Sequence, residues 1–305
     1  METIELTSVQ IEEAKFFLKR GELVAIPTET VYGLAAPTFS PSVSKIFALK
    51  NRPADNPLIV HIASFSMVKS LVSQLPKSFD PLTRAFWPGP LTLILPKNKG
   101  VPDLVTGGHP TVAIRMPAHP TALRLIEAME EPLVAPSANL SGKPSPTTAE
   151  HVLEDFRGKL AAVLDGGPCT IGIESTVLSL VGEKPILLRP GAVTRRQIED
   201  CLGVSLPENS HCGAPPSPGM KYRHYAPIAP IRLIDTLAPL ANQTNPFLLS
   251  REPTTLSLYR PLNSKTLYAF LRESDRIQAK EIWILLDPVV LSDEALMNRI
   301  KRASE

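Results

Sequence analysis

The chain has 305 residues, of which 43% are hydrophobic and 20% charged, and its formal net charge is +2. This balance indicates a globular protein large enough for two domains, and it gives no global electrostatic reason to expect nucleic-acid or membrane binding. No apolar run approaches the ~20 residues of a membrane span. The three cysteines form no C-x-x-C pair and the first residues lack a signal-peptide pattern, so we expect a cytoplasmic protein without a structural zinc site.

The first predicted elements are a helix and a buried strand. Thr7 to Arg20 has a helical apolar face, with Thr7 and Gln10 as a capping box and Gly21 as its end. The strand Leu23 to Ile26 then runs into Pro27 to Gly33, P-T-E-T-V-Y-G. Two hydroxyls and a carboxylate therefore follow a strand, which is where α/β proteins usually bind ligands.

A turn with two cations comes next. The segment Ser40 to Leu49 is predicted to be a helix, after which Lys50 and Arg52 enter an exposed turn that Pro53 makes rigid. Leu58 to Ile62 follows as a buried strand. Cations at the end of a helix can simply complement its dipole, so this motif alone leaves a structural explanation open.

The middle of the chain alternates helices and strands. We predict helices over 64–72, 78–87 and 120–129, strands over 91–95, 111–115 and 133–135, and a loop over 97–110. Arg115 ends the strand T-V-A-I-R, on the same side as Thr111. Such an arginine can hold a carboxylate in a fork, although a surface arginine would give the same pattern.

The loop Pro136 to Thr147 directly follows a buried strand and carries several hydrogen-bonding side chains. These are Ser137, Asn139, Ser141 and Ser145. Thr147 and Glu150 are then predicted to cap a helix that reaches Phe156. A turn-rich linker is the alternative interpretation of this loop.

Further strands are predicted over 161–165, from 173 and over 186–188, the last one ending in R-P-G at Arg189. Thr194 and Gln197 should cap a helix that Gly203 ends. Residues 207–227 form a linker that finishes with P-G-M-K-Y-R-H-Y-A-P, and prolines at both ends suggest that it docks as a lid. Residues 228–305 alternate strands and helices and predict a small α/β domain.

Five motifs, P-T-E-T-V-Y-G, K-x-R, S-A-N, E-S-T-V and L-R-P-G, make the sequence closely similar to the YrdC-like threonylcarbamoyl-AMP synthases. The lid segment and the extra domain resemble the two-domain, Sua-type branch. The resemblance implies an α/β fold, with a twisted mixed sheet in residues 1–206 and a small Rossmann-like domain in 228–305. It also implies formation of L-threonylcarbamoyl-adenylate from L-threonine, bicarbonate and ATP, with release of pyrophosphate.

The resemblance assigns roles to individual residues. Lys50 and Arg52 would be catalytic and would meet the phosphates together with Arg189. Other nucleotide contacts would come from Asn56, Thr111, Ser137, Asn139, Ser145 and Tyr225. Threonine would be surrounded by Thr30, His61, Arg115, Ala135 and Ser175. Mg²⁺ is expected with the triphosphate, and the sequence identifies no protein ligands for it.

A downstream complex would transfer the threonylcarbamoyl group to tRNA, and the basic concave face of the family allows weak RNA binding. One alternative is a non-catalytic RNA-binding module of the same fold, which would not need Thr30, His61, Arg115 and Ser175 together. Another is carbamoyl transfer, as in hydrogenase maturation proteins with additional zinc-finger parts. The C-terminal region is shorter than the resemblance leads us to expect, and S-D-E-A stands where a glycine-rich turn would be expected.

Overall fold

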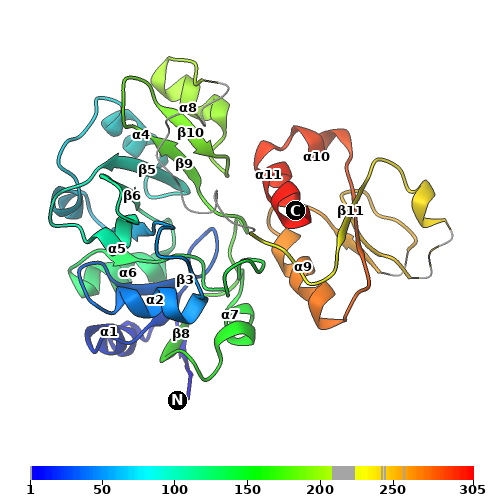
Figure 1. The fold of residues 1–305 in the computed structure, drawn as a ribbon, viewed down its shortest axis with the longest axis horizontal. Coiled ribbons are helices and arrows are strands. Elements are labelled where there is room, and N and C mark those ends of the chain that lie inside the picture. Colours follow the sequence, from blue (N-terminus) through cyan, green and yellow to red (C-terminus); the bar gives the residue numbers. More distant parts are fainter. Residues whose placement is uncertain (1, 208–223, 242, 244, 257) are drawn as a thin grey trace.

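The structure, a computed structural model, describes residues 2–207, 224–241, 243, 245–256 and 258–305. Figure 1 shows two bodies side by side, a large unit made by the N-terminal two thirds of the chain and a small unit made by the C-terminal third. Most of the predicted linker, including Lys221, Tyr222 and Arg223, lies outside the described residues.

The large unit contains one mixed sheet of ten strands, which agrees with the predicted fold class. From edge to edge the strand order is β1, β8, β2, β3, β7, β4, β6, β5, β9 and β10. The bounds are β1 (Ile4–Thr7), β2 (Val24–Ile26), β3 (Gly33–Pro37), β4 (Ile59–His61), β5 (Leu91–Pro96), β6 (Thr111–Arg115), β7 (Leu133–Val134), β8 (Ala162–Asp165), β9 (Thr176–Ser179) and β10 (Ile186–Arg189).

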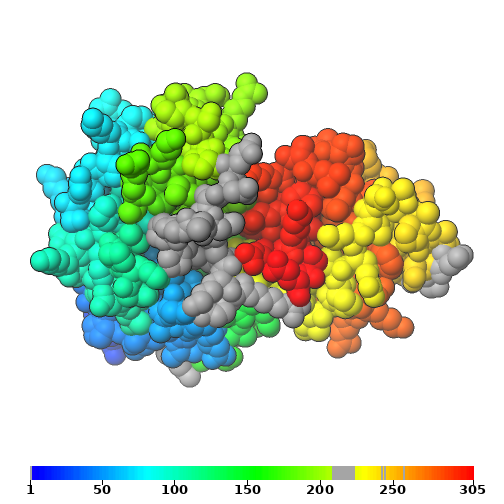
Figure 2. Space-filling model, turned by 45° about the horizontal axis from the view of Figure 1, so that its top comes forward, coloured from blue at the N-terminus to red at the C-terminus, as the bar shows by residue number. Residues whose placement is uncertain are grey.

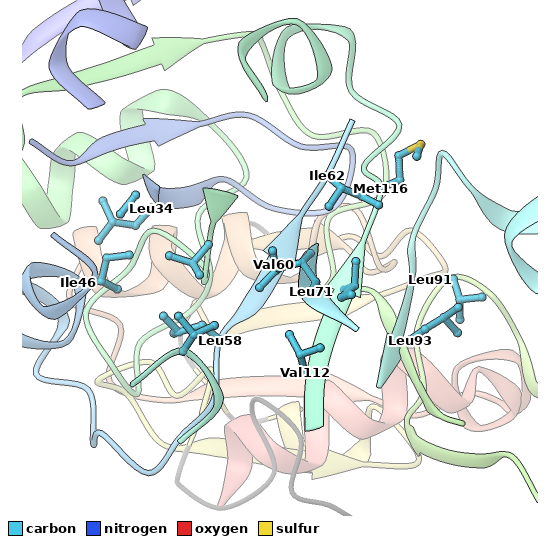
Figure 3. Close-up of a cluster of buried hydrophobic side chains, with 14 of the residues drawn as sticks. Leu34, Ile46, Leu58, Val60, Ile62, Leu71, Leu91, Leu93, Val112 and Met116 are labelled. Carbon is cyan, nitrogen blue, oxygen red and sulfur yellow. The ribbon is translucent and has the colours of Figure 1, made fainter. Parts of the chain in front are cut away.

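The helices of the large unit pack on both faces of this sheet. They are α1 (Ile11–Lys19), α2 (Val43–Lys50), η1 (Phe65–Met67), α3 (Val68–Leu71), α4 (Phe79–Phe86), α5 (Asp103–Thr106), α6 (Pro120–Met129), α7 (Ala149–Phe156) and α8 (Arg195–Leu202). Alternate strand residues therefore enter two cores. Leu34 and Val60 join Ile46 of α2 on one face (Figure 3), whereas Ala35 and Leu133 lie on the other face with α1 and α6.

Alternate side chains of β4 and β6 point to opposite faces of the sheet, and those on one face can form a site. Val60 and Ile114 are paired neighbours, and both are buried in the core of Figure 3. The next pair, His61 and Arg115, points to the opposite face, where His61 also lies opposite Leu133 of β7. Two titratable side chains are thus held next to each other by the register of three strands.

The small unit is a four-stranded parallel sheet with the order β11, β14, β12 and β13. Its elements are β11 (Ile231–Ile234), η2 (Ala238–Leu240), β12 (Phe247–Ser250), β13 (Tyr259–Pro261), α9 (Leu267–Arg276), β14 (Ile282–Leu285), α10 (Pro288–Ser292) and α11 (Glu294–Ser304). Its core includes Leu271 and Ile300, and it continues into Val31 and Ile173 of the large unit. The two units therefore share buried apolar surface.

Two helix starts were predicted wrongly. Thr7 ends the edge strand β1, and the first helix begins at Ile11. Thr7 does bind the Gln10 side chain, through both its backbone nitrogen and its hydroxyl, but this contact closes the turn between strand and helix. At α7 the capping hydroxyl belongs to Thr148, one residue after the predicted Thr147.

Several short elements were not predicted. The segments β1, β3, β13, α5 and α10 have three to five residues each, and α5 lies inside the predicted loop 97–110. Segments this short carry too few periodic positions for their pattern to be recognised. In contrast, the capping box of Thr194 and Gln197 was predicted correctly, as was Gly203, which ends α8 in a left-handed conformation.

Candidate active site

A cavity opens in the large unit where the predicted motifs meet, and its empty space of about 580 Å³ includes the solvent at its mouth. Nine of the residues selected from the sequence line it. They are Thr30, Arg52, His61, Arg115, Ala135, Ser137, Ser175, Arg189 and Tyr225. We call the walls made by Thr30, His61, Arg115 and Ala135 the sheet side, and those made by Arg52, Ser137, Glu174, Arg189 and Tyr225 the loop side. Ser175 lies between them.

Arg115 is fixed on the sheet side by three groups of the large unit. Its Nε donates to the carbonyl of Gly89 (3.1 Å), and its Nη1 donates to the hydroxyl of Thr30 (2.8 Å). Its Nη2 lies 2.5 Å from Glu29 Oε1, in an orientation that makes no hydrogen bond to the described residues. The guanidinium is therefore oriented by two acceptors and charge-compensated by Glu29.

The hydroxyl of Thr30 can only accept a further hydrogen bond. Thr28 Oγ1 donates to the carbonyl of Val31 (2.6 Å), so in its 2.8 Å contact with Thr30 Oγ1 it must accept. The Thr30 proton consequently points at Thr28, and one of its lone pairs already receives Arg115. The remaining lone pair suits a donor such as an amine.

His61 is a neutral imidazole beside this arginine. Burial, and then the nearby Arg115 cation, lowers the pKa of His61 to about 3. Its Nδ1 lies 3.3 Å from the carbonyl of Ile59, which can only accept, so Nδ1 carries the proton. Nε2 is then left as an acceptor.

On the loop side, Arg52 is held by two carbonyls of its own turn. Its Nε donates to Asn56 (3.2 Å) and its Nη2 donates to Pro57 (2.8 Å). The predicted rigid turn thus fixes the direction of the guanidinium. The left-handed residue Asn51, at φ 52°, caps α2 just before it.

Lys50 does not lie in an exposed turn, contrary to our prediction. It is the last residue of α2 and is 1% exposed. Its Nζ donates to the carbonyls of Ser137 and Asn139, and its own carbonyl accepts from the nitrogen of Ser141 (2.9 Å). Lys50 therefore connects the loop Pro136 to Thr147, which we call the S-A-N loop, to the turn that begins at Lys50 and carries Arg52. Burial, and then Arg52, lowers the pKa of Lys50 well below its usual value.

Glu174 is a cavity residue that we had not selected. Its carboxylate accepts from Ser145 (2.5 Å), Tyr268 (2.8 Å) and Arg299 (2.9 Å). Burial alone would raise the pKa of Glu174, but Arg299 and then Arg189 outweigh it and lower the pKa to about 2. The carboxylate is thus ionised and buried at neutral pH.

Arg189 lies beside Glu174 and is bound to the backbone of the E-S-T motif. Its Nε and Nη2 donate to the carbonyl of Ser175, at 3.1 and 3.0 Å. The hydroxyl of Ser175 also lies 2.7 Å from that of Thr92. Two guanidinium groups, Arg52 and Arg189, line the loop side together with the carboxylate of Glu174, which Arg299 already compensates. This side has a positive excess that suits an anion.

His224 and Tyr225 complete the wall. Tyr225 is 3% exposed and has a left-handed backbone, at φ 66°. The nitrogen of Ala226 donates to the carbonyl of Gly142 (2.8 Å), which fastens this segment to the S-A-N loop. Burial, and then Arg52, lowers the pKa of His224 to about 4, and its buried Nε2 has no hydrogen-bond partner among the described residues.

Five of the selected residues do not line the cavity. Lys50, Asn139 and Ser145 lie directly behind its loop side, where Ser145 binds Glu174 and the Asn139 amide donates to Leu140 and Lys143. Asn56 is buried and lends its carbonyl to Arg52. Thr111 begins β6, four residues and roughly 13 Å along the strand from Arg115.

The sequence analysis also passed over Glu29, His224, Tyr268 and Arg299. Glu29 directly precedes Thr30 and Glu174 directly precedes Ser175, both inside motifs that we had recognised. Their position in these motifs could have marked them as site residues. Among the described residues, no group of three or more His, Cys, Asp or Glu side chains could hold a metal ion. No described helix is long and apolar enough to cross a membrane.

Two family profiles match the chain. The profile described as "Telomere recombination" matches residues 17–191, and the profile described as "Threonylcarbamoyl-AMP synthase, C-terminal domain" matches residues 193–305. The threonylcarbamoyl-AMP synthase of Pyrococcus abyssi is 51% identical over 239 residues, which are 77% of this chain and 70% of that protein. The Bacillus subtilis enzyme is 52% identical over 231 residues, which are 74% of this chain and 67% of that protein.

Solved structures agree with this match. P. abyssi Sua5 in complex with L-threonine superposes with a TM-score of 0.89 at 40% sequence identity, over 100% of this chain and 98% of that one. A variant of the same protein, in which a histidine and the tyrosine after it are alanine, gives a TM-score of 0.90 over 99% and 96% of the two chains. The chain therefore belongs to the two-domain, Sua5-type threonylcarbamoyl-AMP synthases, the ATP-using nucleotidyltransferases of tRNA threonylcarbamoyladenosine modification.

Proposed function

We propose that the cavity holds L-threonine on its sheet side and ATP on its loop side, so that the two meet near Ser175. The amine of threonine and bicarbonate give a carbamate with loss of water, and a carbamate oxygen then attacks the α-phosphate and releases pyrophosphate. The observation that carries this proposal is a single cavity with a neutral, polar sheet side and a cationic loop side. The complex of P. abyssi Sua5 with L-threonine supports it.

On the sheet side, Arg115 would bind the carboxylate of threonine, because its guanidinium lines the cavity and is held in a fixed orientation. Thr30 would accept a hydrogen bond from the amine, since its own proton points at Thr28. His61 would offer Nε2 as an acceptor and Ala135 would limit the space beside it. Ser175 would contact threonine from the boundary of the two sides.

On the loop side, Arg52 and Arg189 would bind the phosphates, with Lys50 behind them. Two of the three Lys50 donors are used by carbonyls, which leaves one for a phosphate oxygen. A bound triphosphate would raise the pKa of Lys50 again, because it adds negative charge beside a buried amine. The polar side chains of Asn56, Thr111, Ser137, Asn139 and Ser145 would hydrogen-bond the rest of the nucleotide.

No covalent nucleophile is required by this reaction. Negative charge grows on the α-phosphate and on the departing pyrophosphate, and fixed cations stabilise it without reorganising. Arg52 suits this role because two carbonyls hold its guanidinium in place before substrate arrives. Mg²⁺ would enter as part of the MgATP substrate, with phosphate oxygens and water as its ligands.

We further propose that residues 1–206 form the catalytic domain, 207–227 a segment that closes the site, and 228–305 a small domain. The described end of the closing segment supports this division, because His224 and Tyr225 line the cavity. A residue other than glycine in the left-handed region costs energy, so the positive φ of Tyr225 suggests a functional requirement. Closure would keep water away from the carbamate and its adenylate.

The product would pass to a separate complex that transfers the threonylcarbamoyl group to tRNA, and we expect this to happen in the cytoplasm. The reaction itself is tested with the purified full chain by following pyrophosphate release from ATP. We expect release only when threonine and bicarbonate are both present, and carbon from labelled bicarbonate in the adenylate. Pyrophosphate release in the absence of threonine or of bicarbonate would contradict the proposal.

A further inference from the structure

Two arginines of the small unit bind the large unit behind the walls of the cavity. Arg299 of α11 and Arg272 of α9 are 0% and 5% exposed, although arginine is rarely buried in proteins. Figure 2 shows the C-terminal elements, in red, on the side of the small unit that faces the large unit. Both side chains form hydrogen bonds with residues that lie in or next to the loop-side wall.

Arg299 binds the two segments that carry Ser175 and Arg189. Its Nε donates to the Glu174 carboxylate (2.9 Å), its Nη2 donates to the Glu174 carbonyl (3.2 Å), and its Nη1 donates to the carbonyl of Pro190 (3.0 Å). Its guanidinium also lies over the ring of Tyr225, 5.6 Å from the ring centre. Tyr268 of α9 donates to the same carboxylate and packs against the same ring.

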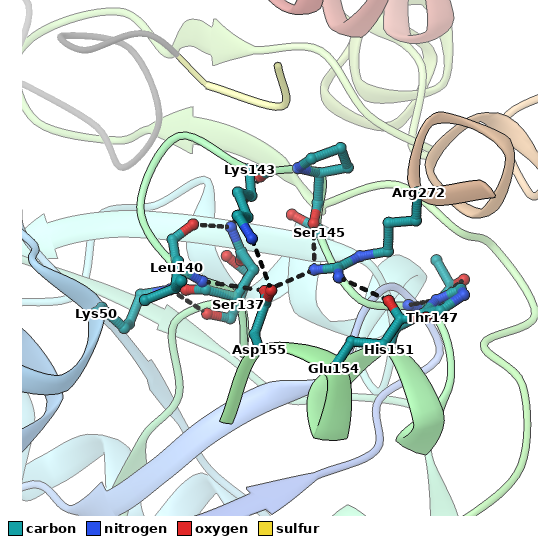
Figure 4. Close-up of polar contacts among 12 residues, drawn as sticks. Lys50, Ser137, Leu140, Lys143, Ser145, Thr147, His151, Glu154, Asp155 and Arg272 are labelled. Atoms are coloured by element: carbon teal, nitrogen blue, oxygen red, sulfur yellow. Dashed lines mark hydrogen bonds and ion pairs between the residues drawn. The ribbon is translucent and has the colours of Figure 1, made fainter. Parts of the chain in front are cut away.

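Arg272 reaches both the loop Pro136 to Thr147 and Asp155, as Figure 4 shows. Its Nη2 donates to the carbonyl of Pro144 (2.7 Å) and to Asp155 Oδ2 (2.9 Å). The same Asp155 oxygen accepts from the nitrogen of Leu140 (3.2 Å). Asp155 therefore connects Arg272 to the loop whose carbonyls bind the amine of Lys50.

The charge of the Glu174 carboxylate affects the part of the cavity where the phosphates are proposed to bind. Glu174 lines the cavity and lies 2.5 Å from Ser145, close to the proposed phosphates. With Arg299 present the pair is neutral, and the phosphates meet the cations of the loop side. Without Arg299, a buried carboxylate would lose its main partner and would repel the phosphates. Arg299 thus affects the field in the cavity as well as the geometry of its wall.

We propose that Arg299 and Arg272 are positioning residues for the nucleotide, through which the small domain sets the geometry and charge of the loop side. This inference rests on the proposed placement of ATP there. The hydrogen bonds of Thr30, His61 and Arg115 described above all stay within the large unit. The small domain should therefore influence ATP and leave threonine almost unaffected.

The test compares affinities for ATP and for threonine in full-length variants. Each ligand is titrated alone by calorimetry, and each KM is measured by pyrophosphate release with the other substrates saturating. For Arg299→Gln and Arg272→Gln we expect the KM and Kd for ATP to rise about tenfold, with values for threonine changing less than about twofold. Tyr268→Phe removes one hydroxyl donor to Glu174, and we expect an increase of about threefold for ATP alone.

Arg276→Gln is the matched control. Arg276 lies on the same helix as Arg272 and reaches the same neighbour, Glu154 (3.7 Å), but it is half exposed. Exposed ion pairs contribute little, so this variant should match the wild type for both substrates. The double variant Arg299→Gln with Glu174→Gln should lose less ATP affinity than the product of the two single effects, because the unpaired carboxylate is gone.

Unchanged ATP affinity in the folded Arg299 and Arg272 variants would overturn the inference, as would equal losses for ATP and threonine. If either arginine variant fails to fold, the inference is judged from Tyr268→Phe. An ATP affinity of Tyr268→Phe equal to that of the wild type then overturns the inference. Failure of the proposed function looks different, because the wild type itself would release no pyrophosphate with threonine and bicarbonate. The calorimetric affinities need no turnover and judge the inference in that case too.

Discussion

On the sheet side of the cavity, His61 and Arg115 stand on paired strands of the central sheet, and their register fixes the distance between them. On the loop side, Arg52, Glu174 and Tyr225 come from segments far apart in the chain, joined by side-chain bonds that extend into the small unit. The geometry of the sheet side is set by the pairing of the strands. The loop side is assembled from loops and depends on domain docking.

This difference suits the two substrates. Threonine is small and rigidly shaped, and a preformed pocket can select it through fixed donors and acceptors. ATP is large and highly charged, and its phosphates change during the reaction, so a wall that closes around it can exclude water at the right moment. The apolar residues Val31 and Ile173 of the large unit pack into the core of the small unit.

The largest predicted effect concerns the loop side. Arg52→Ala should reduce the rate of adenylate formation about a thousandfold, because a preorganised cation next to the transferring phosphate is lost. Steady-state pyrophosphate release gives the rate, and the melting temperature shows whether the fold is intact. Lys45→Ala, which removes an exposed cation from α2, the helix before the turn that carries Arg52, is the control and should retain full activity. Near-normal turnover of Arg52→Ala would refute the role assigned to this residue.

A second prediction addresses the sheet side through its substrate. Valine has the shape of threonine without the hydroxyl, and buried partners left unpaired cost ~1–3 kcal/mol. We expect kcat/KM for valine to be roughly 5–100-fold lower than for threonine, as measured in competition for labelled bicarbonate. Equal use of both amino acids would mean that this wall does not recognise the hydroxyl.

A third prediction separates the closing segment from the rest of the loop side. Tyr225→Ala should raise the KM for ATP roughly tenfold, because the ring closes the wall over the nucleotide. Tyr225→Phe keeps the ring and should behave almost like the wild type. A loss in Tyr225→Phe as large as in Tyr225→Ala would assign the effect to the hydroxyl instead of to closure.

The smallest effect is on stability. His61 and His224 have folded pKa values of about 3 and 4, below the usual 6.5, so the unfolded chain takes up their protons first and stability falls as the pH drops from 6.5. Glu174, with a pKa of about 2 instead of 4.5, adds a loss between pH 4.5 and 2. We expect urea unfolding to show a decline of at most ~1.4 kcal/mol per pH unit for each group.

A variant distinguishes the two parts of this decline. Glu174→Gln should make the loss below pH 4.5 smaller, since only the histidine contributions then continue towards pH 3, and it should leave the loss between pH 6.5 and 4.5 unchanged. An unfolding free energy that stays constant from pH 6.5 to 4.5 would contradict the burial of neutral histidines.

The sequence predicted the sheet side more completely than the loop side. Strand alternation places His61 and Arg115 on one face, and it can be read from a few residues. Lys50 was predicted to be exposed because a helix end next to a proline turn usually is, and its two carbonyl partners lie about 90 residues away. Glu174 and Arg299 are separated by 125 residues, and nothing local marks them as partners. The motifs gave the candidate residues, whereas the bonds between the two units required the fold.

The division of the cavity is tested most directly by a crossed binding experiment. ATP and threonine are titrated separately by calorimetry into the wild type, Arg52→Ala and Arg115→Gln. We predict that Arg52→Ala weakens ATP binding at least tenfold and leaves threonine affinity unchanged, and that Arg115→Gln does the reverse, since hydrogen bonds to charged groups are worth ~1.5–3 kcal/mol. Comparable losses of both ligands in both variants would contradict two separately built sides.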